Sequence, residues 1–377
     1  LESYWQGLIS GKSGAAPITR FDAEKFKTRF ACEIKNYDVQ EHFDRKEARK
    51  LDPFTQYAMI AADEAISDAD LQIEKLDKYR VGVIWGAGIG GLETFQNQIL
   101  DHASGDGTPK FNPFFIPKMI ADIAPGHISI KHGFMGPNYT TVSACASSAN
   151  ALIDALNTIR MGYCDVVVSG GSEAAVNISG VAGFNAMHAL STNNDSPETA
   201  SRPFDATRDG FVLGEGAGAL ILEDLDHALA RGAKIYAEVI GGGLSSDAYH
   251  LTAPHPDGLG VIRVMENCLK DSGIRPEDVD AINTHGTSTP LGDVAELKAI
   301  STVFGDHAPN ININSTKSMT GHLLGAAGAI EAIASTLSIV NGIVPPTINH
   351  SVVDERIDSR LNLTLNQAQK RDVTIAM

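Results

Sequence analysis

The stretch Ala65-Ile66-Ser67-Asp68-Ala69-Asp70-Leu71 leads into a strand-like run over 80–85 and then a glycine loop over 86–91. The order returns later in the chain, where Cys268-Leu269-Lys270-Asp271-Ser272-Gly273-Ile274 leads into a strand-like run over 281–284 and another glycine-containing loop. Downstream, each copy shows a strand, a turn of small residues and a long helical pattern.

This internal repeat predicts two similar halves, 1–230 and 231–377, related by a pseudo-twofold axis. Such an axis would bring the two turns together at the centre of the sheets. The alternative is chance similarity between two helix–turn–strand units, which share a common pattern.

Apolar runs and helical periodicity alternate along the chain, which predicts an α/β fold with a mostly parallel sheet covered by helices. We expect strands at 81–85, 139–143, 166–169, 217–222, 236–241, 281–284 and 311–315. Helical patterns fall at 55–69, 147–161, 224–231, 258–272, 292–303 and 325–341. Residues 1–8 also read as a helix and 372–377 as a strand, and we infer that both natural termini are truncated.

Cys145 lies in Val142-Ser143-Ala144-Cys145-Ala146-Ser147-Ser148, where a β-rich run gives way to a helical pattern. The sulfur is therefore expected at a helix N-terminus, where unpaired N–H groups and the macrodipole favour an anion. A thiol in that position is expected to have a lowered pKa and to attack carbonyl groups as a thiolate. The alternative interpretation is a buried structural cysteine.

Two histidines in the second half are candidate partners of Cys145. His285 follows the expected strand 281–284, and ligands bind at the carboxyl ends of strands in α/β sheets. His322 follows Lys317 by five residues, and Glu331 lies nine residues further on. A nearby lysine disfavours imidazolium, and a neutral histidine can donate a hydrogen bond to a developing oxyanion. For each residue singly, a structural histidine or a solvated charge is the alternative.

Composition narrows the class of protein. The chain has 377 residues, with 43% hydrophobic and 20% charged residues, as in ordinary globular proteins. The formal net charge of −16 argues against nucleic acid as the main partner. We expect no membrane span and, from the four cysteines without disulfide spacing, a reducing cytoplasmic setting.

Two further motifs are weak. Gly86-Ala87-Gly88-Ile89-Gly90-Gly91 matches a dinucleotide-binding pattern, but no acidic residue closes a following strand, and a tight turn explains the glycines. The twelve histidines show no metal-ligand spacing, so we expect no metal. Asp44-Arg45-Lys46-Glu47-Ala48-Arg49-Lys50 is a basic island in an acidic chain, either a solvated helix face or a docking site for an anionic partner.

Four blocks give a resemblance to a known family. They are Val142–Ser148, Ser201–Asp205 with Arg208–Gly218, His285–Thr289, and Lys317–His322. In this order they resemble the β-ketoacyl-[acyl carrier protein] synthases, specifically the elongating type II group (ketosynthase II) of bacterial fatty-acid synthesis. The resemblance implies the thiolase fold, with two βα repeats in five αβαβα layers, usually as a homodimer.

The resemblance also implies an acyltransferase that elongates fatty acids by two carbons. Cys145 would carry the acyl chain, and its backbone N–H would form part of an oxyanion hole. His285 and His322 would hold the malonyl thioester carbonyl during decarboxylation. Lys317 and Glu331 would form a supporting charge pair. No cofactor is implied, because the substrates are carried on the phosphopantetheine arm of acyl carrier protein.

The resemblance assigns further residues to substrate and carrier binding. Thr287 and Thr289 would contact the phosphopantetheine arm, and Phe111 and Phe184 would line the acyl pocket. Lys46 and Lys50 would dock the acidic carrier protein, while His188 stands where relatives carry an arginine. The family's Gly-Phe-Gly-Gly loop, with a second oxyanion donor, would come after Met377.

Three alternatives remain open at this point. A cysteine hydrolase would use Cys145 and His285 but leaves His322 and the Lys317 block unexplained. A non-catalytic partner of a ketosynthase would lack the active cysteine. A thiolase would need a second catalytic cysteine, and Cys32, Cys164 and Cys268 lie outside the loops where it is expected.

Overall fold

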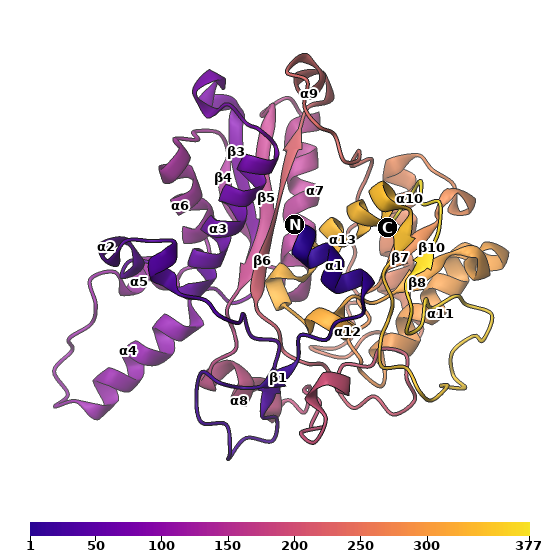
Figure 1. Cartoon of the computed structure of the whole chain (residues 1–377), viewed down its shortest axis with the longest axis horizontal. Helices are drawn as coiled ribbons and strands as arrows, with labels where there is room; N and C mark the ends of the chain where they lie inside the picture. The colour runs from indigo at the N-terminus through magenta and orange to yellow at the C-terminus, as the bar shows by residue number, and fades with distance from the viewer.

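The computed structural model describes residues 1–377 and shows one four-stranded and three two-stranded sheets, with helices packed around them (Figure 1). The strands are β1 (Ala16–Pro17), β2 (Phe30–Ala31), β3 (Val81–Gly86), β4 (Asn138–Thr141), β5 (Val166–Glu173), β6 (Gly216–Glu223), β7 (Ala281–Asn283), β8 (Asn312–Asn314), β9 (Ile343–Val344) and β10 (Gln369–Lys370). The α-helices are α1 (Glu2–Ile9), α2 (Arg45–Ala48), α3 (Pro53–Asp68), α4 (Leu92–Ser104), α5 (Phe115–Met119), α6 (Ile123–His132), α7 (Ser147–Arg160), α8 (Ile178–Ala186), α9 (Leu225–Ala230), α10 (Leu259–Ser272), α11 (Gly292–Phe304), α12 (Lys317–Thr320) and α13 (Ala327–Asn341).

The larger sheet has the strand order β4-β3-β5-β6. Strand β3 runs parallel to β4 and β5, whereas β6 is antiparallel to β5. Side chains alternate between its faces: Val83 and Trp85 pack with α3 and α6, whereas Ile84 and Val167 pack with α7. Because both faces of β3 and β5 are buried, β3 and the start of β5 read as apolar runs in the sequence.

The elements form five layers. Helices α3 and α6 cover one face of the larger sheet, and α7 and α13 cover the other. Helix α13 also contacts β7, which pairs in parallel with β8. On the far side, Ile282 and Ile313 pack against residues of α10 and α11. The predicted αβαβα arrangement is therefore confirmed, and its layers can be followed across Figure 1.

The internal repeat is visible in the backbone. A short 3₁₀ turn, η4 (Ala144–Ala146), leads directly into α7, and a matching turn, η8 (Leu324–Ala326), leads directly into α13. Each turn begins with a non-glycine residue in the left-handed region, Ala144 at φ 50° and Leu324 at φ 48°. Such a conformation costs roughly 1–2 kcal/mol for an L-residue. Its presence at the same place in both halves therefore supports the internal repeat.

Two expected strands differ in the structure. Residues 236–241 form no strand; within and next to this stretch, Ile240 O accepts from Arg160 and Gly242 N–H donates to Asp271. At the other end, Ala281 N–H donates to Ile375 O and Met377 N–H donates to Ala281 O. The segment 372–377 therefore lies along β7 but makes only an isolated bridge to it.

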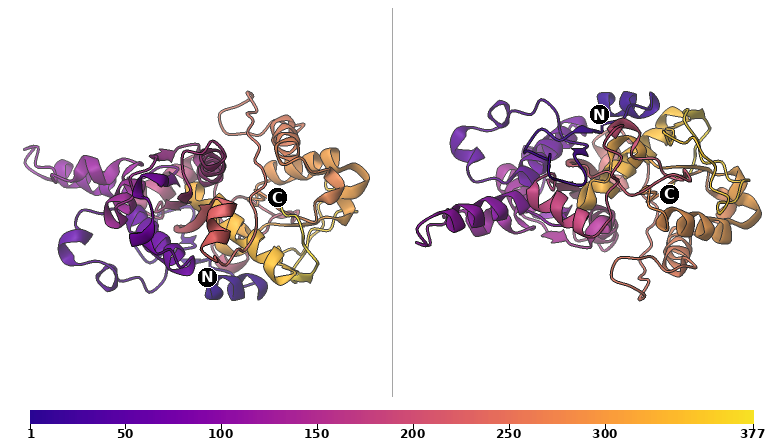
Figure 2. Two further views of the ribbon diagram at one scale, coloured as in Figure 1. Left: turned by 90° about the horizontal axis from the view of Figure 1, so that it is seen from above. Right: turned by 90° about the horizontal axis from the view of Figure 1, so that it is seen from below.

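The N-terminal helix joins the two halves of the chain. The expected helix at 1–8 is present as α1, whose Trp5 and Leu8 are buried against Met319, Leu337 and Ile348. Seen from above and below, α1 lies beside the C-terminal part of the chain (Figure 2). The first residues of the chain thus pack into the core of its C-terminal half.

One helical stretch departs from the expected absence of a membrane span. Residues Leu324–Asn341 are long and apolar enough to cross a membrane by length and composition, with a mean hydropathy of 1.3. Half of this stretch is buried inside the protein. Helix α13 contacts α7, β5 and β6, so its composition is explained by its place in the central layer.

Candidate active site

The turn that carries Cys145 is built by hydroxyl groups. Ser147 Oγ accepts from the Ser143 N–H at 2.9 Å and donates to Ala144 O at 2.7 Å, while Thr141 Oγ1 donates to Ser147 O at 2.7 Å. These bonds hold the left-handed Ala144 in place. They leave Cys145 partly buried at the N-terminus of α7, as the sequence predicts.

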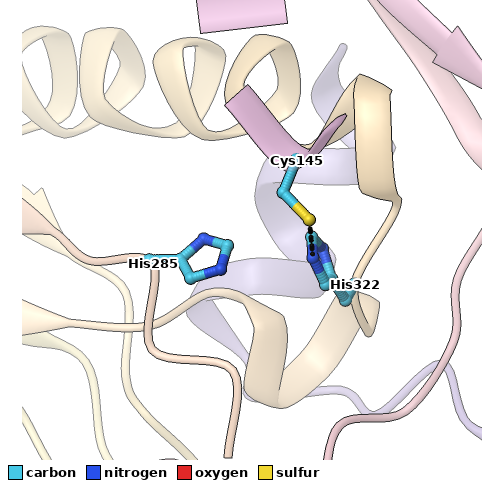
Figure 3. Close-up of side chains that lie close together, drawn as sticks. All are labelled: Cys145, His285 and His322. Carbon is cyan, nitrogen blue, oxygen red and sulfur yellow. Dashed lines mark hydrogen bonds between the residues drawn. The ribbon is translucent and has the colours of Figure 1, made fainter. Parts of the chain in front are cut away.

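His322 reaches the sulfur from the second half of the chain. Its backbone N–H donates to Val212 O at 2.7 Å and its carbonyl accepts from Gly214 N–H at 2.9 Å, so a segment of the first half fixes its position. The ring is buried, and Nε2 lies 2.9 Å from Cys145 Sγ. Figure 3 shows this contact and the ring of His285 beside it.

The protonation of His322 follows from a backbone contact. The Leu324 N–H donates to His322 Nδ1 at 3.3 Å. A backbone N–H can only donate, so Nδ1 is the accepting nitrogen. Burial, then His285 and Lys317, lower the pKa of His322 well below its usual value, so the ring is neutral. The single proton of the neutral ring is therefore on Nε2, facing Cys145.

His285 stands across from His322 on the loop after β7. Its backbone N–H and that of Gly286 donate to the Glu296 carboxylate at 2.7 and 2.8 Å. The two imidazole rings lie edge to face with centroids 5.2 Å apart. His285 is exposed, but desolvation by the surrounding protein and then the charge of Lys317 lower its pKa to about 3.

Lys317 is a fully buried cation next to both histidines. It pairs with Glu331 of α13. Burial raises the pKa of Glu331, whereas Lys317 lowers it. Both histidines have lowered pKa values partly because of the positive charge of Lys317. The predicted contact between Lys317 and Glu331 is thus present in the structure.

The expected lowering of the Cys145 pKa is wrong. Burial raises the pKa of the thiol, and Glu173 and Glu331 act in the same direction, while Lys317 opposes them. The effect of desolvation on an anionic sulfur exceeds that of the favourable charge. At neutral pH the resting group is therefore a thiol, and its ionisation depends on the proton donor at His322 Nε2 and on substrate binding.

The same three side chains could in principle hold a metal ion. The donor atoms of Cys145, His285 and His322 lie within 4.8 Å of one another, a grouping that their sequence spacing does not reveal. However, the Leu324 N–H on Nδ1 selects the tautomer whose Nε2 carries a proton. Histidines that ligate metals usually donate from their other nitrogen instead. The geometry favours hydrogen-bond donation to a substrate over metal binding.

Some of the residues assigned to substrate binding lie near the site. The ring centroid of Phe184 lies 5.4 Å from that of Phe211, and the ring centroid of Phe211 lies 5.2 Å from that of His322. Thr287 and Thr289 lie on the loop that carries His285, and their hydroxyl groups are 3.2 Å apart.

Other assigned residues lie elsewhere. Phe111 makes its aromatic contacts with Phe115 and His102, beside α4 and α5, rather than with Cys145. Lys46 and Lys50 are exposed on and just after α2, with Lys50 Nζ 5.7 Å from the centre of the Phe114 ring. The structure thus brings together the residues of the reaction centre and leaves these three apart from it.

Sequence reasoning missed two carboxylates at the site, one half-buried and one fully buried. Glu296 orients the His285 loop from α11, and Glu173 ends β5 with its carboxylate on the glycine loop after β3. A usable signal existed: Glu173 is an acidic residue at the end of the apolar run Val166–Gly171. The expected strand ends at Ser169, four residues before Glu173, so the sequence pattern gives no sign that this charge is buried.

Comparisons with known proteins agree with this geometry. Residues 1–228 match the N-terminal domain of β-ketoacyl synthases and residues 236–351 match their C-terminal domain. The 3-oxoacyl-[acyl-carrier-protein] synthase 2 of Staphylococcus aureus (strain COL) is 48% identical over 380 residues, covering 100% of this chain and 90% of that protein. The corresponding protein of Synechocystis (strain ATCC 27184 / PCC 6803 / Kazusa) is 49% identical with the same coverage.

Solved structures extend the likeness to three dimensions. The ishigamide ketosynthase/chain length factor superposes with a TM-score of 0.92 at 35% identity, covering 100% of this chain and 90% of that one. A type II polyketide ketosynthase bound to the hexaketide, in complex with its acyl-carrier protein (AntDE:AntF), superposes with a TM-score of 0.87 at 33% identity and the same coverage. The predicted thiolase fold is confirmed. The chain belongs to the β-ketoacyl synthase family.

Proposed function

We propose that this chain is a 3-oxoacyl-[acyl carrier protein] synthase, an acyltransferase that elongates fatty acids by decarboxylative Claisen condensation. The observation that carries the proposal is the convergence of one cysteine and two neutral histidines on a shared space, with Nε2 of His322 2.9 Å from Cys145 Sγ. A cysteine hydrolase needs a single base near the thiol, whereas two neutral donors suit the stabilisation of an enolate.

The first half-reaction loads the acyl chain. The Cys145 sulfur attacks the thioester carbonyl of the acyl carrier, the carrier thiolate leaves, and the thiol proton of Cys145 is transferred to it. The products are an acyl-Cys145 thioester and the free carrier thiol. The N-terminus of α7 and the Nε2–H of His322 favour negative charge on the sulfur as it attacks. The backbone N–H of Cys145 contributes to the oxyanion hole.

The second half-reaction forms the carbon–carbon bond. Malonyl carrier protein binds with its thioester carbonyl between His285 and His322, and carbon dioxide leaves with its bonding electrons remaining on the substrate as an enolate. Both rings must be neutral to donate without transferring their protons, and their lowered pKa values support this role. The enolate carbon attacks the acyl-Cys145 carbonyl, and the Cys145 thiolate is released and takes up a proton from water.

The buried charge pair supports these donors. Lys317 disfavours protonation of both histidines, and Glu331 balances the charge of Lys317 in a site with little exposed surface. Lys317 and Glu331 are therefore positioning and electrostatic groups, whereas Cys145, His285 and His322 contact the reacting atoms.

Substrate delivery follows from the remaining assignments. Thr287 and Thr289 would contact the phosphopantetheine arm that carries the substrates, and no separate cofactor is needed. Phe184 would line the acyl pocket through its packing on Phe211. Within its own chain, Phe111 packs with residues of α4 and α5. In this proposal it lines an acyl pocket only in a dimer, where a second copy of the chain brings it close.

The acyl carrier protein is the expected partner. One structural relative is a ketosynthase in complex with its acyl-carrier protein. The basic residues Lys46 and Lys50 are exposed in a chain with a net charge of −16, which gives an acidic carrier a local docking point.

A homodimer is part of the proposal. Strand β4 is an edge strand of the larger sheet, and its Tyr139 together with the adjacent Val142 is exposed, at 38% and 62%. An unprotected edge with apolar side chains favours pairing with a second chain. The proposed assembly is a cytoplasmic homodimer of chains that each divide near residue 230, with one half carrying Cys145 and the other the two histidines.

The test supplies acyl and malonyl carrier protein and identifies the products by mass. The proposal expects a 3-oxoacyl carrier two carbons longer than the acyl substrate. Release of free fatty acid without a new carbon–carbon bond would instead indicate a cysteine hydrolase. Condensation by a Cys145→Ala variant at the wild-type rate would refute the assigned nucleophile.

A further inference from the structure

Glu173 is a buried carboxylate next to the reaction centre that the proposed chemistry does not use. It ends β5 and has no exposed surface. All four of its hydrogen bonds come from backbone N–H groups, those of Gly88, Ile89, Gly90 and Gly325. Burying a carboxylate among neutral donors costs folding free energy, so a role for Glu173 in this position has to be sought.

These donors come from both halves of the chain. Gly88, at 2.8 Å, and Gly325, at 3.1 Å, share the oxygen Oε2. Gly88 belongs to the glycine loop after β3, whereas Gly325 is the middle residue of η8. A Cβ on Gly88 would lie 2.6 Å from that oxygen, so this glycine is needed to bring the loop onto the carboxylate. The GxGxxG pattern is thereby explained without a nucleotide.

The contact with Gly325 continues to His322. Gly325 directly follows Leu324, whose own N–H donates to His322 Nδ1. Leu324 is held in the left-handed region at φ 48°, a conformation that a leucine leaves unless its neighbours fix it. Two hydrogen bonds hold it there: the Ala327 N–H donates to Leu324 O, and the Gly325 N–H donates to Glu173.

We propose that Glu173 is a positioning residue: by holding the Gly325 N–H it keeps the Leu324 N–H on Nδ1 of His322, and so keeps the histidine proton on Nε2, facing the substrate carbonyl. The proposal rests on the function proposed above for His322. Without Glu173, Leu324 is free to relax, Nδ1 loses its donor, and both tautomers of the ring become accessible.

The charge of Glu173 has a separable effect on Cys145. This carboxylate raises the pKa of the Cys145 thiol, as Glu331 does, while Lys317 lowers it and burial contributes most. The neutral rings of His285 and His322 also face the sulfur. Replacing Glu173 by glutamine therefore lowers the thiol pKa while it disturbs His322. Decarboxylation and the reactivity of the Cys145 sulfur then respond differently, which a general loss of folded protein cannot produce.

The experiment compares Glu173→Gln with the wild type. Burial raises the pKa of Glu173 to about 7, so assays at about pH 8 keep it ionised in the wild type. We expect decarboxylation of malonyl carrier protein to fall roughly 10–100-fold. This is the usual loss when a group that orients a metal-bound histidine is removed, and the orienting role here is the same. We expect alkylation of Cys145 by iodoacetamide to be unchanged or faster.

Nitrogen NMR of histidine-labelled protein supplies a readout that does not depend on activity. In the wild type, Nδ1 of His322 is expected to be unprotonated, and Glu173→Gln is expected to shift the signal toward the other tautomer. Gly88→Ala is the second variant, because its new methyl group displaces the same carboxylate without changing its charge. It is expected to give the same NMR change.

Asp205→Asn is the matched control. Asp205 is also a buried carboxylate that accepts backbone N–H groups, but from Ser351 and Val352. It is expected to lower stability with no change in the His322 tautomer or in the ratio of decarboxylation to alkylation. An unchanged tautomer in Glu173→Gln, or a parallel fall of both reactions, would overturn the positioning role. A wild type that neither decarboxylates nor condenses would instead refute the proposed function.

Discussion

The turns before α7 and α13 share one backbone conformation but present different groups to their surroundings. Each is a single 3₁₀ turn that starts with a left-handed residue, Ala144 or Leu324, and runs directly into a long helix. The second residue is Cys145 in the first half and Gly325 in the second. One turn presents a side chain to the substrate, and the other presents its backbone to Glu173.

The surroundings explain this difference. Cys145 is only partly buried. At Gly325, a Cβ would lie 2.1 Å from Gly88 N, so no side chain fits there. The second half instead supplies His322, two residues before its turn begins. A duplicated structure has thus divided the reaction, with the nucleophile from one copy and the hydrogen-bond donors from the other.

The largest expected effect comes from removing the nucleophile. Cys145→Ala is expected to lower condensation by on the order of 10⁴-fold or more, because no other group can carry the acyl chain. Decarboxylation of malonyl carrier protein is expected to continue, since its donors belong to the second half. Product analysis by mass measures both, with Cys268→Ala as the control for loss of a cysteine. Loss of both activities in Cys145→Ala alone would contradict the division between the halves.

Removing a donor from the second half is expected to have the next largest effect. His322→Ala and His285→Ala should each raise the barrier to decarboxylation by about 2.7–4 kcal/mol, the cost of one oxyanion donor. Acylation of Cys145 should be less affected, particularly in His285→Ala. Rapid-quench measurement of acyl-enzyme formation beside carbon dioxide release separates the two steps. Equal damage to both steps would show that the histidines serve loading as much as decarboxylation.

Adding a side chain to the second turn tests why the halves differ. Gly325→Ala forces a methyl group against the backbone of Gly88 and should destabilise the fold by about 1–3 kcal/mol or more, as overpacking of a core does. Gly7→Ala is the control, because nothing lies within 4 Å of a Cβ at Gly7. Urea unfolding compares them. A Gly325→Ala protein as stable as the wild type would show that this turn tolerates a side chain.

The buried neutral ring of His322 predicts a dependence of stability on pH. Its pKa is lowered in the folded state, so below about pH 6.5 the unfolded chain takes up a proton that folded His322 does not. Unfolding then binds protons, and the free energy of unfolding falls as the pH falls, by at most about 1.4 kcal/mol per pH unit for one histidine.

The measurement for this prediction is urea unfolding at several pH values below neutral. His322→Phe should show a shallower loss of stability in acid than the wild type. The exposed His188 serves as the control, and His188→Asn should keep the wild-type slope. An identical slope in all three proteins would mean that His322 binds its proton equally well in the folded and unfolded states.

The smallest effect is expected at the proposed docking surface, which lies on the first half. Lys46→Glu with Lys50→Glu should raise the KM for carrier-bound substrates by roughly tenfold or less, with little change in kcat, and the effect should weaken with added salt. Lys270→Glu, an exposed lysine on α10 in the second half, is the control. A similar KM change in the control would indicate only a general effect of net charge.

The pattern of apolar residues along the sequence predicts much of the fold. Strands β3, β5 and β6 and helices α3, α7 and α13 fall where apolar runs and helical periodicity predict them, because each is long and buried on defined faces. Residues 236–241 have the composition of a strand but form none, because a strand needs the backbone of a partner strand and composition alone does not supply one.

The sequence by itself determined the repeat, the position of Cys145 before a helix and the candidate histidines, because these depend on local pattern and residue type. Only the tertiary structure decided that Cys145 and His322 meet at 2.9 Å, that burial raises the pKa of Cys145, and that Glu173 connects the two halves. Hydrogen bonds and desolvation depend on which distant segments enclose a group, and that information is not carried by its neighbours in the chain.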